Sequence, residues 1–219
     1  MSVLNSSIAR KVAMALSAFF LLIFLLLHFV INLTSVISPD SFNEFSHFMG
    51  TNPLIQFLMQ PVLIFGVVFH FVMGFILEAR NKSARSVGYV KYAGSENSTW
   101  MSRNMIYSGL VVLAFLLLHF IDFWLPELNY KYIQHNPEDP TRYYHELIEK
   151  FHNPVRVGAY VLAFVLLALH LLHGFQSAFQ SVGFNNKYTP AIKKLGNLYA
   201  ILIPLGFIFI ALFHYFNAH

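Results

Sequence analysis

Cysteine is absent from all 219 residues of the chain, and only 11% of the residues are charged. Without cysteine the chain can form no disulfide, no cysteine-bound zinc site and no thiolate-bound iron–sulfur cluster. A metal ion would therefore have to be bound by histidine, carboxylate or methionine side chains. Soluble domains carry about 25% charged residues, so the shortage of charge indicates a different environment.

The apolar residues, 57% of the chain, gather in five long runs rather than being spread evenly. Each run is long enough for a helix of about 20 residues, which spans a hydrocarbon core of about 30 Å. The sequence thus predicts an all-α membrane protein, a single domain over residues 1–219. The predicted transmembrane helices are residues 12–33, 54–77, 105–125, 157–179 and 198–216. Four of them lack Asp, Glu, Lys and Arg, and the third contains only Asp122.

Basic residues are concentrated in the segments on one side of the predicted membrane. The N-terminal tail and the loops 78–104 and 180–197 hold ten of the 14 Lys and Arg residues. Because Lys and Arg in short loops mark the cytoplasmic face, the N-terminus is predicted to be cytoplasmic in a bacterial inner membrane. The C-terminus then lies outside. The inner basic surface also suits anionic lipid or a soluble protein partner; a nucleic-acid partner is not predicted.

Six of the 11 histidines fall inside the predicted spans, where a polar side chain is costly and usually functional. These six are His28, His70, His119, His170, His173 and His214. The other five lie in loops or at the C-terminus, where a solvated histidine is expected.

The depths of four of these histidines match in pairs. His28 and His119 come late in two outward-running helices, and His70 and His170 come late in two inward-running ones. In an up-down bundle, alternate helices are parallel diagonal partners. The first four helices are therefore expected to form such a bundle around two stacked haems. The outer haem would take His28 and His119 as axial ligands, and the inner haem His70 and His170, as in bis-histidine b-type cytochromes.

Two local patterns repeat at these histidines. Phe-Leu-Leu-Leu-His-Phe occurs at 24–29 and at 115–120, and His-x-x-x-Gly occurs at 70–74 and at 170–174. A glycine four residues after a histidine lies on the same helix face. We expect Gly74 and Gly174 to leave room there for a flat ring, and close helix packing is the alternative.

Several further polar residues in or near the spans admit two interpretations. His173 is an alternative fourth-helix ligand, although only His170 repeats the spacing to glycine. If His170 is the ligand, His173 could instead hydrogen-bond a haem propionate. Arg103 could neutralise inner haem propionates or could be a topology charge. Glu44 and His47, expected near the outer haem, are candidates for a quinone site, and the alternative is an ordinary polar loop. His214 has no partner at its depth and is expected at the outer interface.

The chain resembles the cytochrome b membrane subunit of succinate dehydrogenase and fumarate reductase, in its single-chain, five-helix, two-haem form. The most specific match is the segment 170–183, HLLHGFQSAFQSVG, in which a histidine precedes one glycine by four residues. A second glycine follows nine residues after the first. Helix number and histidine placement match over nearly the whole chain, whereas the hydrophilic loop 126–154 has no counterpart.

The resemblance implies two haems b and a heterotrimeric complex of the tricarboxylic acid cycle or of fumarate respiration. A flavoprotein with FAD and an iron–sulfur subunit would bind on the cytoplasmic side and carry out the dicarboxylate chemistry. This chain would anchor them and pass electrons between the clusters and menaquinone. The alternatives are the cytochrome b anchor of a hydrogenase or formate dehydrogenase, and a transporter or proton relay without haem.

Overall fold

The computed structural model describes residues 6–83 and 104–217 of the chain, and Arg103 lies outside them. Across these two ranges all regular structure is helical. The elements are α1 (Ser7–Ile37), α2 (Pro39–Thr51), η2 (Ile55–Met59), α3 (Gln60–Ser83), α6 (Met105–His119), η3 (Phe120–Trp124), α7 (Leu125–Leu128), η4 (Asn129–Ile133), α8 (Arg142–Phe151), α9 (Pro154–Ser181) and α10 (Thr189–Asn217), with η marking π-helical turns.

Within the described residues, five helices are long and apolar enough to cross a membrane, which confirms an all-α membrane protein. They cover Ser7–Ile37, Ile55–Ser83, Met105–Ile133, Pro154–Ser181 and Thr189–Asn217, each longer than the predicted apolar run. The additional helical turns lie at the polar ends of the spans, where capping residues set the helix boundaries. Asn153 caps α9 by accepting hydrogen bonds from the backbone N–H groups of Val155 and Arg156, and Pro154 occupies its first turn.

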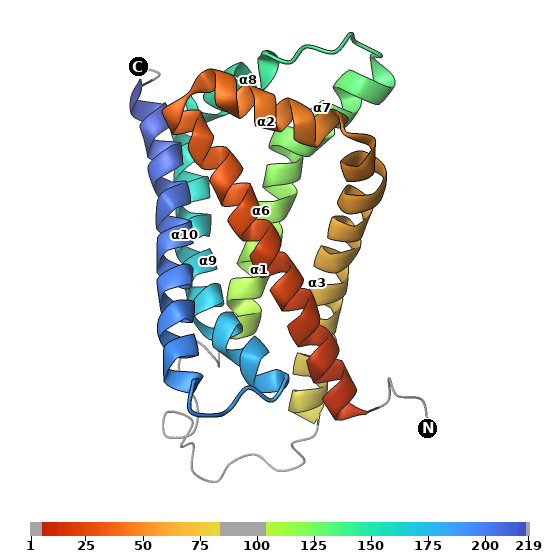
Figure 1. Cartoon of the computed structure of the whole chain (residues 1–219), viewed down its shortest axis with the longest axis vertical. Coiled ribbons are helices and arrows are strands. Elements are labelled where there is room, and N and C mark those ends of the chain that lie inside the picture. Colours follow the sequence, from red (N-terminus) through yellow and green to blue (C-terminus); the bar gives the residue numbers. More distant parts are fainter. Residues whose placement is uncertain (1–5, 84–103, 218–219) are drawn as a thin grey trace.

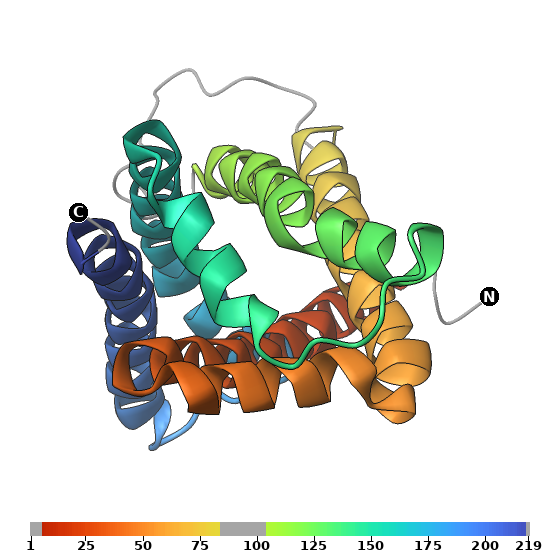
Figure 2. The same ribbon diagram turned by 90° about the horizontal axis from the view of Figure 1, so that it is seen from above.

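Four of the spans form a ring. Helix α1 packs against α3 and α9, and α6 packs against the same two helices, so that α1 lies diagonally across from α6 and α3 across from α9 (Figure 2). This is the up-down arrangement expected for the first four spans. Helix α10 lies outside the ring and packs most extensively against α9, and also against α1 (Figure 1).

The contact of α10 with the ring is made by close aromatic packing. Phe207 of α10 lies 5.3 Å from Phe29 of α1 and 5.2 Å from Phe164 of α9, measured between ring centroids. Gly206 allows this approach, because a Cβ atom there would lie 2.3 Å from the Phe29 ring. Nearer the other end of α10, the Tyr199 hydroxyl donates a hydrogen bond of 2.6 Å to the Leu22 carbonyl of α1.

One end of the ring, the capped end, is crossed by α2 and α8 (top of Figure 1). Helix α8 packs against α2, α9 and α10, and the Tyr144 N–H donates to the Asn43 side chain at 2.8 Å. The opposite end is called the lower end. The hydrophilic loop that follows the third span is thus largely part of this cap.

His214, which was expected at the outer interface, lies near the end of α10 and is buried inside the protein. His214 is 2% exposed, and its Nε2 atom lies 2.8 Å from the hydroxyl of Ser35, which is 1% exposed. Phe151 of α8 stacks parallel to the imidazole, with ring centroids 6.5 Å apart. The sequence offered no partner at the depth of His214, because α8, which covers it, was not predicted.

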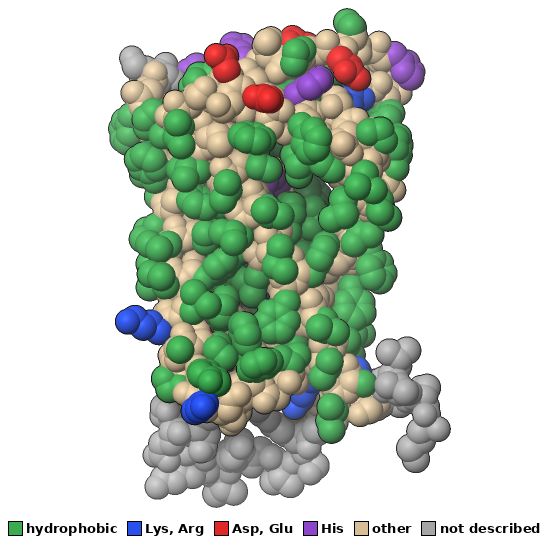
Figure 3. Space-filling model, in the orientation of Figure 1, with side chains coloured by type: hydrophobic (Ala, Val, Ile, Leu, Met, Phe, Trp, Pro, Cys, Tyr) green, Lys and Arg blue, Asp and Glu red, His purple; other side chains and the backbone are tan. Residues whose placement is uncertain are grey.

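The side of the molecule is apolar between two polar ends (Figure 3). In this view the acidic side chains lie at the capped end and most Lys and Arg side chains at the lower end. A hollow opens in the upper half, between α1 and α3, and a histidine is visible inside it. Such a belt fits a molecule surrounded by lipid, and many large apolar side chains on the described surface are exposed.

Gly206→Ala is expected to destabilise the folded protein by about 2 kcal/mol, because the added methyl group overlaps Phe29 and a well-packed core resists such insertions. The measurement is thermal unfolding in detergent. The matched control is Gly158→Ala on α9, where a Cβ would meet nothing within 4 Å. Equal melting temperatures for the two variants would contradict the packing described for α10.

Candidate functional site

His28 and His119 face each other across the ring. They come from the diagonal helices α1 and α6, and their ring centroids lie 5.7 Å apart with the planes at 85°. Two imidazoles that bind one metal ion from opposite sides, with metal–nitrogen bonds of about 2 Å, have ring centroids roughly 6 Å apart. The separation of this capped-end pair therefore suits a shared axial metal ion.

Aromatic side chains surround the capped-end pair. Phe24 stacks on His28 at 5.4 Å, and Phe207 of α10 lies 5.8 Å from the same ring. Phe123 lies 5.2 Å from His119. Such a lining suits a flat apolar group.

The nitrogens of the capped-end pair have few hydrogen-bond partners. The Nδ1 atom of His119 is buried and has no hydrogen bond within the described part of the protein. The Asn32 amide lies 3.4 Å from Nε2 of His28, but its better bond, at 2.8 Å, goes to the His28 carbonyl. A neutral imidazole has one nitrogen without a proton, and such a nitrogen can bind a metal ion.

His70 and His170 form a second pair, the lower-end pair, on the other diagonal. The Ser17 hydroxyl lies 3.0 Å from Nδ1 of His70, and the Ser108 hydroxyl lies 3.2 Å from Nδ1 of His170. Each serine comes from a neighbouring span, Ser17 from α1 and Ser108 from α6.

Ser17 and Ser108 were missed in the sequence, although a signal for them is present. Ser17 precedes His28 by eleven residues, and Ser108 precedes His119 by eleven residues. At 1.5 Å per residue, the two histidine levels are therefore about 16 Å apart along the helix. This shared spacing between serine and histidine is a further similarity between the first two spans and the next two.

The glycines near the lower-end pair are flanked by flexible side chains. A Cβ at Gly74 would lie 3.7 Å from the end of Met14, and one at Gly174 would lie 3.4 Å from the end of Met105. A methionine end adapts readily to a neighbouring group, so both faces can still accommodate a ring. Gly109 directly faces His170, whose Cε1 would lie 3.6 Å from an added Cβ.

Three or more metal-binding side chains gather nowhere within residues 6–83 and 104–217. The two histidine pairs are consistent with this, since an axially bound macrocycle needs only two protein ligands. His173 lies one turn from His170 on α9, half-buried. The assignment of the four paired histidines as metal ligands remains a prediction, and so does the role of His173.

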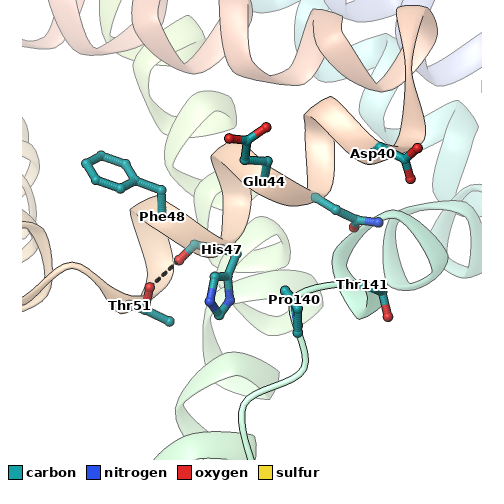
Figure 4. Close-up of a pocket in the computed structure, with 8 residues that line it drawn as sticks. Asp40, Glu44, His47, Phe48, Thr51, Pro140 and Thr141 are labelled. Carbon is teal, nitrogen blue, oxygen red and sulfur yellow. Dashed lines mark hydrogen bonds between the residues drawn. The ribbon is translucent and has the colours of Figure 1, made fainter.

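Glu44 and His47 both line an open pocket of about 480 Å³ on the outer side of α2. Asp40, Asn43, Phe48 and Thr51 of the same helix line it too, with Pro140 and Thr141 opposite. The two candidates project in different directions, His47 towards Pro140 and Glu44 away from it (Figure 4). His47 also approaches Glu138, with 3.8 Å between nitrogen and oxygen.

An ion-pair cluster fastens the cap beside this pocket. Arg142 of α8 bonds Glu127 and Glu146, and Lys131 bonds Glu127 and the Gly50 carbonyl at the end of α2. Burial alone lowers the pKa of Arg142, but its bonds to the two glutamates raise it above the usual value. Burial, reinforced by the charge of Glu127, raises the pKa of the adjacent Tyr143 to about 12. Arg142 therefore stays charged and the phenol stays protonated at neutral pH.

Asp122, the acid within the third span, belongs to a separate buried cluster. It is 3% exposed and lies in η3, the π-helical turn that begins directly after His119. Its carboxylate accepts a hydrogen bond of 2.9 Å from the Tyr160 hydroxyl and lies 3.0 Å from the Arg156 guanidinium. Both partners are on α9, so the cluster joins the third and fourth spans next to the capped-end pair.

Comparison with models of known protein families, with curated proteins and with solved structures gave no match.

Asp122→Ala is expected to destabilise the protein by about 2 kcal/mol, because it leaves the buried Tyr160 hydroxyl and the Arg156 charge without their shared acceptor. Tyr160→Phe removes one hydrogen bond and should cost about 1 kcal/mol. Thermal unfolding of the purified protein measures both. Glu149→Ala, on the exposed surface of α8, is the control; a loss as large as that of Asp122→Ala would refute the role of the cluster.

Proposed function

We propose that this protein is a di-haem cytochrome b membrane subunit that anchors a succinate dehydrogenase or fumarate reductase and transfers electrons across the membrane. The observation that carries the proposal is the opposed pair His28 and His119, 5.7 Å apart on diagonal spans, with His70 and His170 on the other diagonal. An isolated imidazole is costly inside a membrane and is normally functional. Four of them, in two pairs about 16 Å apart along the helices, match the ligand set of two stacked haems.

The chain's own residues would hold the two groups, one on each level. His28 and His119 would bind at the capped end, and His70 and His170 at the lower end. When bound, each haem supplies a one-electron acceptor and donor. Aromatic side chains around the capped-end pair would contact the bound group, and the four helices would hold the two levels at fixed depths.

The lower end would receive the soluble partners. In the view of Figure 3 it carries most of the Lys and Arg side chains, and basic short loops are typical of the cytoplasmic side. An iron–sulfur subunit docked there would lie nearer His70 and His170 than the other pair, and a flavoprotein with FAD would bind to it. Because this chain has no cysteine, the clusters would belong to the partner.

Menaquinone would react at the capped end. The hollow between α1 and α3 gives an apolar molecule a lateral route from the lipid (Figure 3). The pocket lined by Glu44 and His47 lies on α2, which crosses that end. Either side chain could exchange protons between the quinone and the outer aqueous phase, which requires a group that can gain and lose a proton.

Purified wild-type protein is expected to contain two haems b per chain by the pyridine haemochrome assay, because each histidine pair binds one. His28→Ala or His70→Ala should each remove one haem and leave the other. His145→Ala, exposed on α8, is the control and should retain both. A wild-type protein with no cytochrome b absorption band after dithionite reduction would refute the proposal and favour a haem-free transporter or proton relay.

Glu44→Gln is expected to slow the reduction of the bound haem by a naphthoquinol by about a hundredfold or more, the usual scale for a lost acid–base group. Stopped-flow absorbance at the cytochrome b band measures the rate, and haem content should not change. Glu149→Gln removes an acid from the same side of the protein but outside the pocket and serves as the control. A rate equal to that of the control would exclude Glu44 from proton exchange.

Co-purified subunits with succinate–quinone activity would distinguish this complex from a hydrogenase or formate dehydrogenase.

A further inference from the structure

Ser17 and Ser108 each approach the Nδ1 atom of a lower-end histidine, and a second contact fixes the direction of that hydrogen bond. The Ser17 hydroxyl lies 2.7 Å from the Met14 carbonyl, and the Ser108 hydroxyl lies 2.9 Å from the Met105 carbonyl. Each carbonyl belongs to the residue three positions earlier in the same helix. Such back-bonding is a common arrangement for serine inside a helix.

A serine hydroxyl has a single proton, whereas its oxygen can accept further hydrogen bonds. The carbonyl can only accept, so it takes the serine proton. The contact of 3.0 Å between Ser17 and His70, and that of 3.2 Å between Ser108 and His170, must then use a proton on the histidine. Nδ1 is therefore the protonated nitrogen in both rings.

We infer that Ser17 and Ser108 are positioning residues that hold His70 and His170 as the Nδ1–H tautomer and thereby direct the Nε2 lone pair of each ring to a metal ion. A neutral imidazole carries its proton on one nitrogen only, and the hydrogen bond made by that nitrogen decides which one is free to bind a metal. The inference concerns the lower-end pair and rests on the proposed function only for the identity of the metal group.

At the capped end, neither histidine contacts a back-bonded serine within the described part of the protein. The Nδ1 atom of His119 is buried without a hydrogen bond among the described residues, and His28 contacts the Asn32 amide, which donates chiefly to a carbonyl. The two levels thus differ in how their ligands are held. Removing a serine should change the lower-end level alone, and the capped-end level then serves as an internal reference.

The chain also provides a matched control. Ser35 has the same back-bonded geometry, with its hydroxyl 2.6 Å from the Asn32 carbonyl and 2.8 Å from His214. His214 belongs to neither pair, so Ser35→Ala removes an equivalent hydroxyl without touching the proposed ligands. Ser17→Thr and Ser108→Thr keep the hydroxyl, since threonine in a helix also bonds the carbonyl three or four residues earlier.

The first experiment needs no haem. In haem-free, ¹⁵N-histidine-labelled full-length protein at neutral pH, NMR is expected to show His70 and His170 protonated on Nδ1, with the signals assigned through His70→Gln and His170→Gln. Ser17→Ala should shift the His70 signals, Ser108→Ala those of His170, and the threonine variants should restore both. Nε2-protonated rings in the wild type, or alanine variants whose His70 and His170 spectra match those of Ser35→Ala, would overturn the inference.

The second experiment uses the haem-loaded protein. Ser17→Ala and Ser108→Ala should each shift the low-spin EPR signal of the lower-end haem and leave the other signal in place, because only the lower-end ligands lose a hydrogen bond. Ser35→Ala should shift neither. Unshifted signals in both alanine variants would overturn the inference even if the protein binds two haems, whereas a haem-free wild type would overturn the proposed function and leave the NMR result decisive.

Discussion

An imidazole inside the hydrocarbon layer must find a partner, and this requirement organises the molecule. Water is not present there to satisfy its nitrogens, so an unpaired ring is expensive. The histidines within the described spans meet the requirement in three ways. His214 bonds Ser35 and is covered by aromatic rings. The two histidines of the lower-end pair each contact a serine hydroxyl. In the capped-end pair, the two imidazoles contact each other across the ring of helices. The last arrangement is the least satisfied by protein alone and the most suited to a bound group.

The transmembrane spans could be predicted from the sequence because the apolar pattern that marks each of them extends over many residues. Long uncharged runs have few alternatives to transmembrane helices, and their alternating direction places parallel helices on diagonals. The matched depths of His28 and His119 thereby predicted a pairing that the side-chain geometry now shows as a contact. Helix ends were less predictable, since caps such as Asn153 and continuing polar turns lie outside the apolar pattern.

The features that could not be predicted depend on contacts between distant segments. The burial of His214 was not predicted because α8, which covers it, arises from a short amphipathic segment inside a hydrophilic loop. Ser17 and Ser108 looked like ordinary small residues of a span, and only their position against His70 and His170 gives them a role. The spacing of eleven residues to the next histidine was present in the sequence, but its meaning requires knowledge of which helices are neighbours.

The diagonal arrangement has a consequence for biogenesis. The first two spans contribute His28 and His70, the next two contribute His119 and His170, and every pair draws one member from each half. Neither half of the chain can therefore complete a binding site by itself during synthesis. The capped-end pair is complete once the third span has been inserted, and the lower-end pair only after the fourth, so a group held by both pairs would report that the whole ring has assembled.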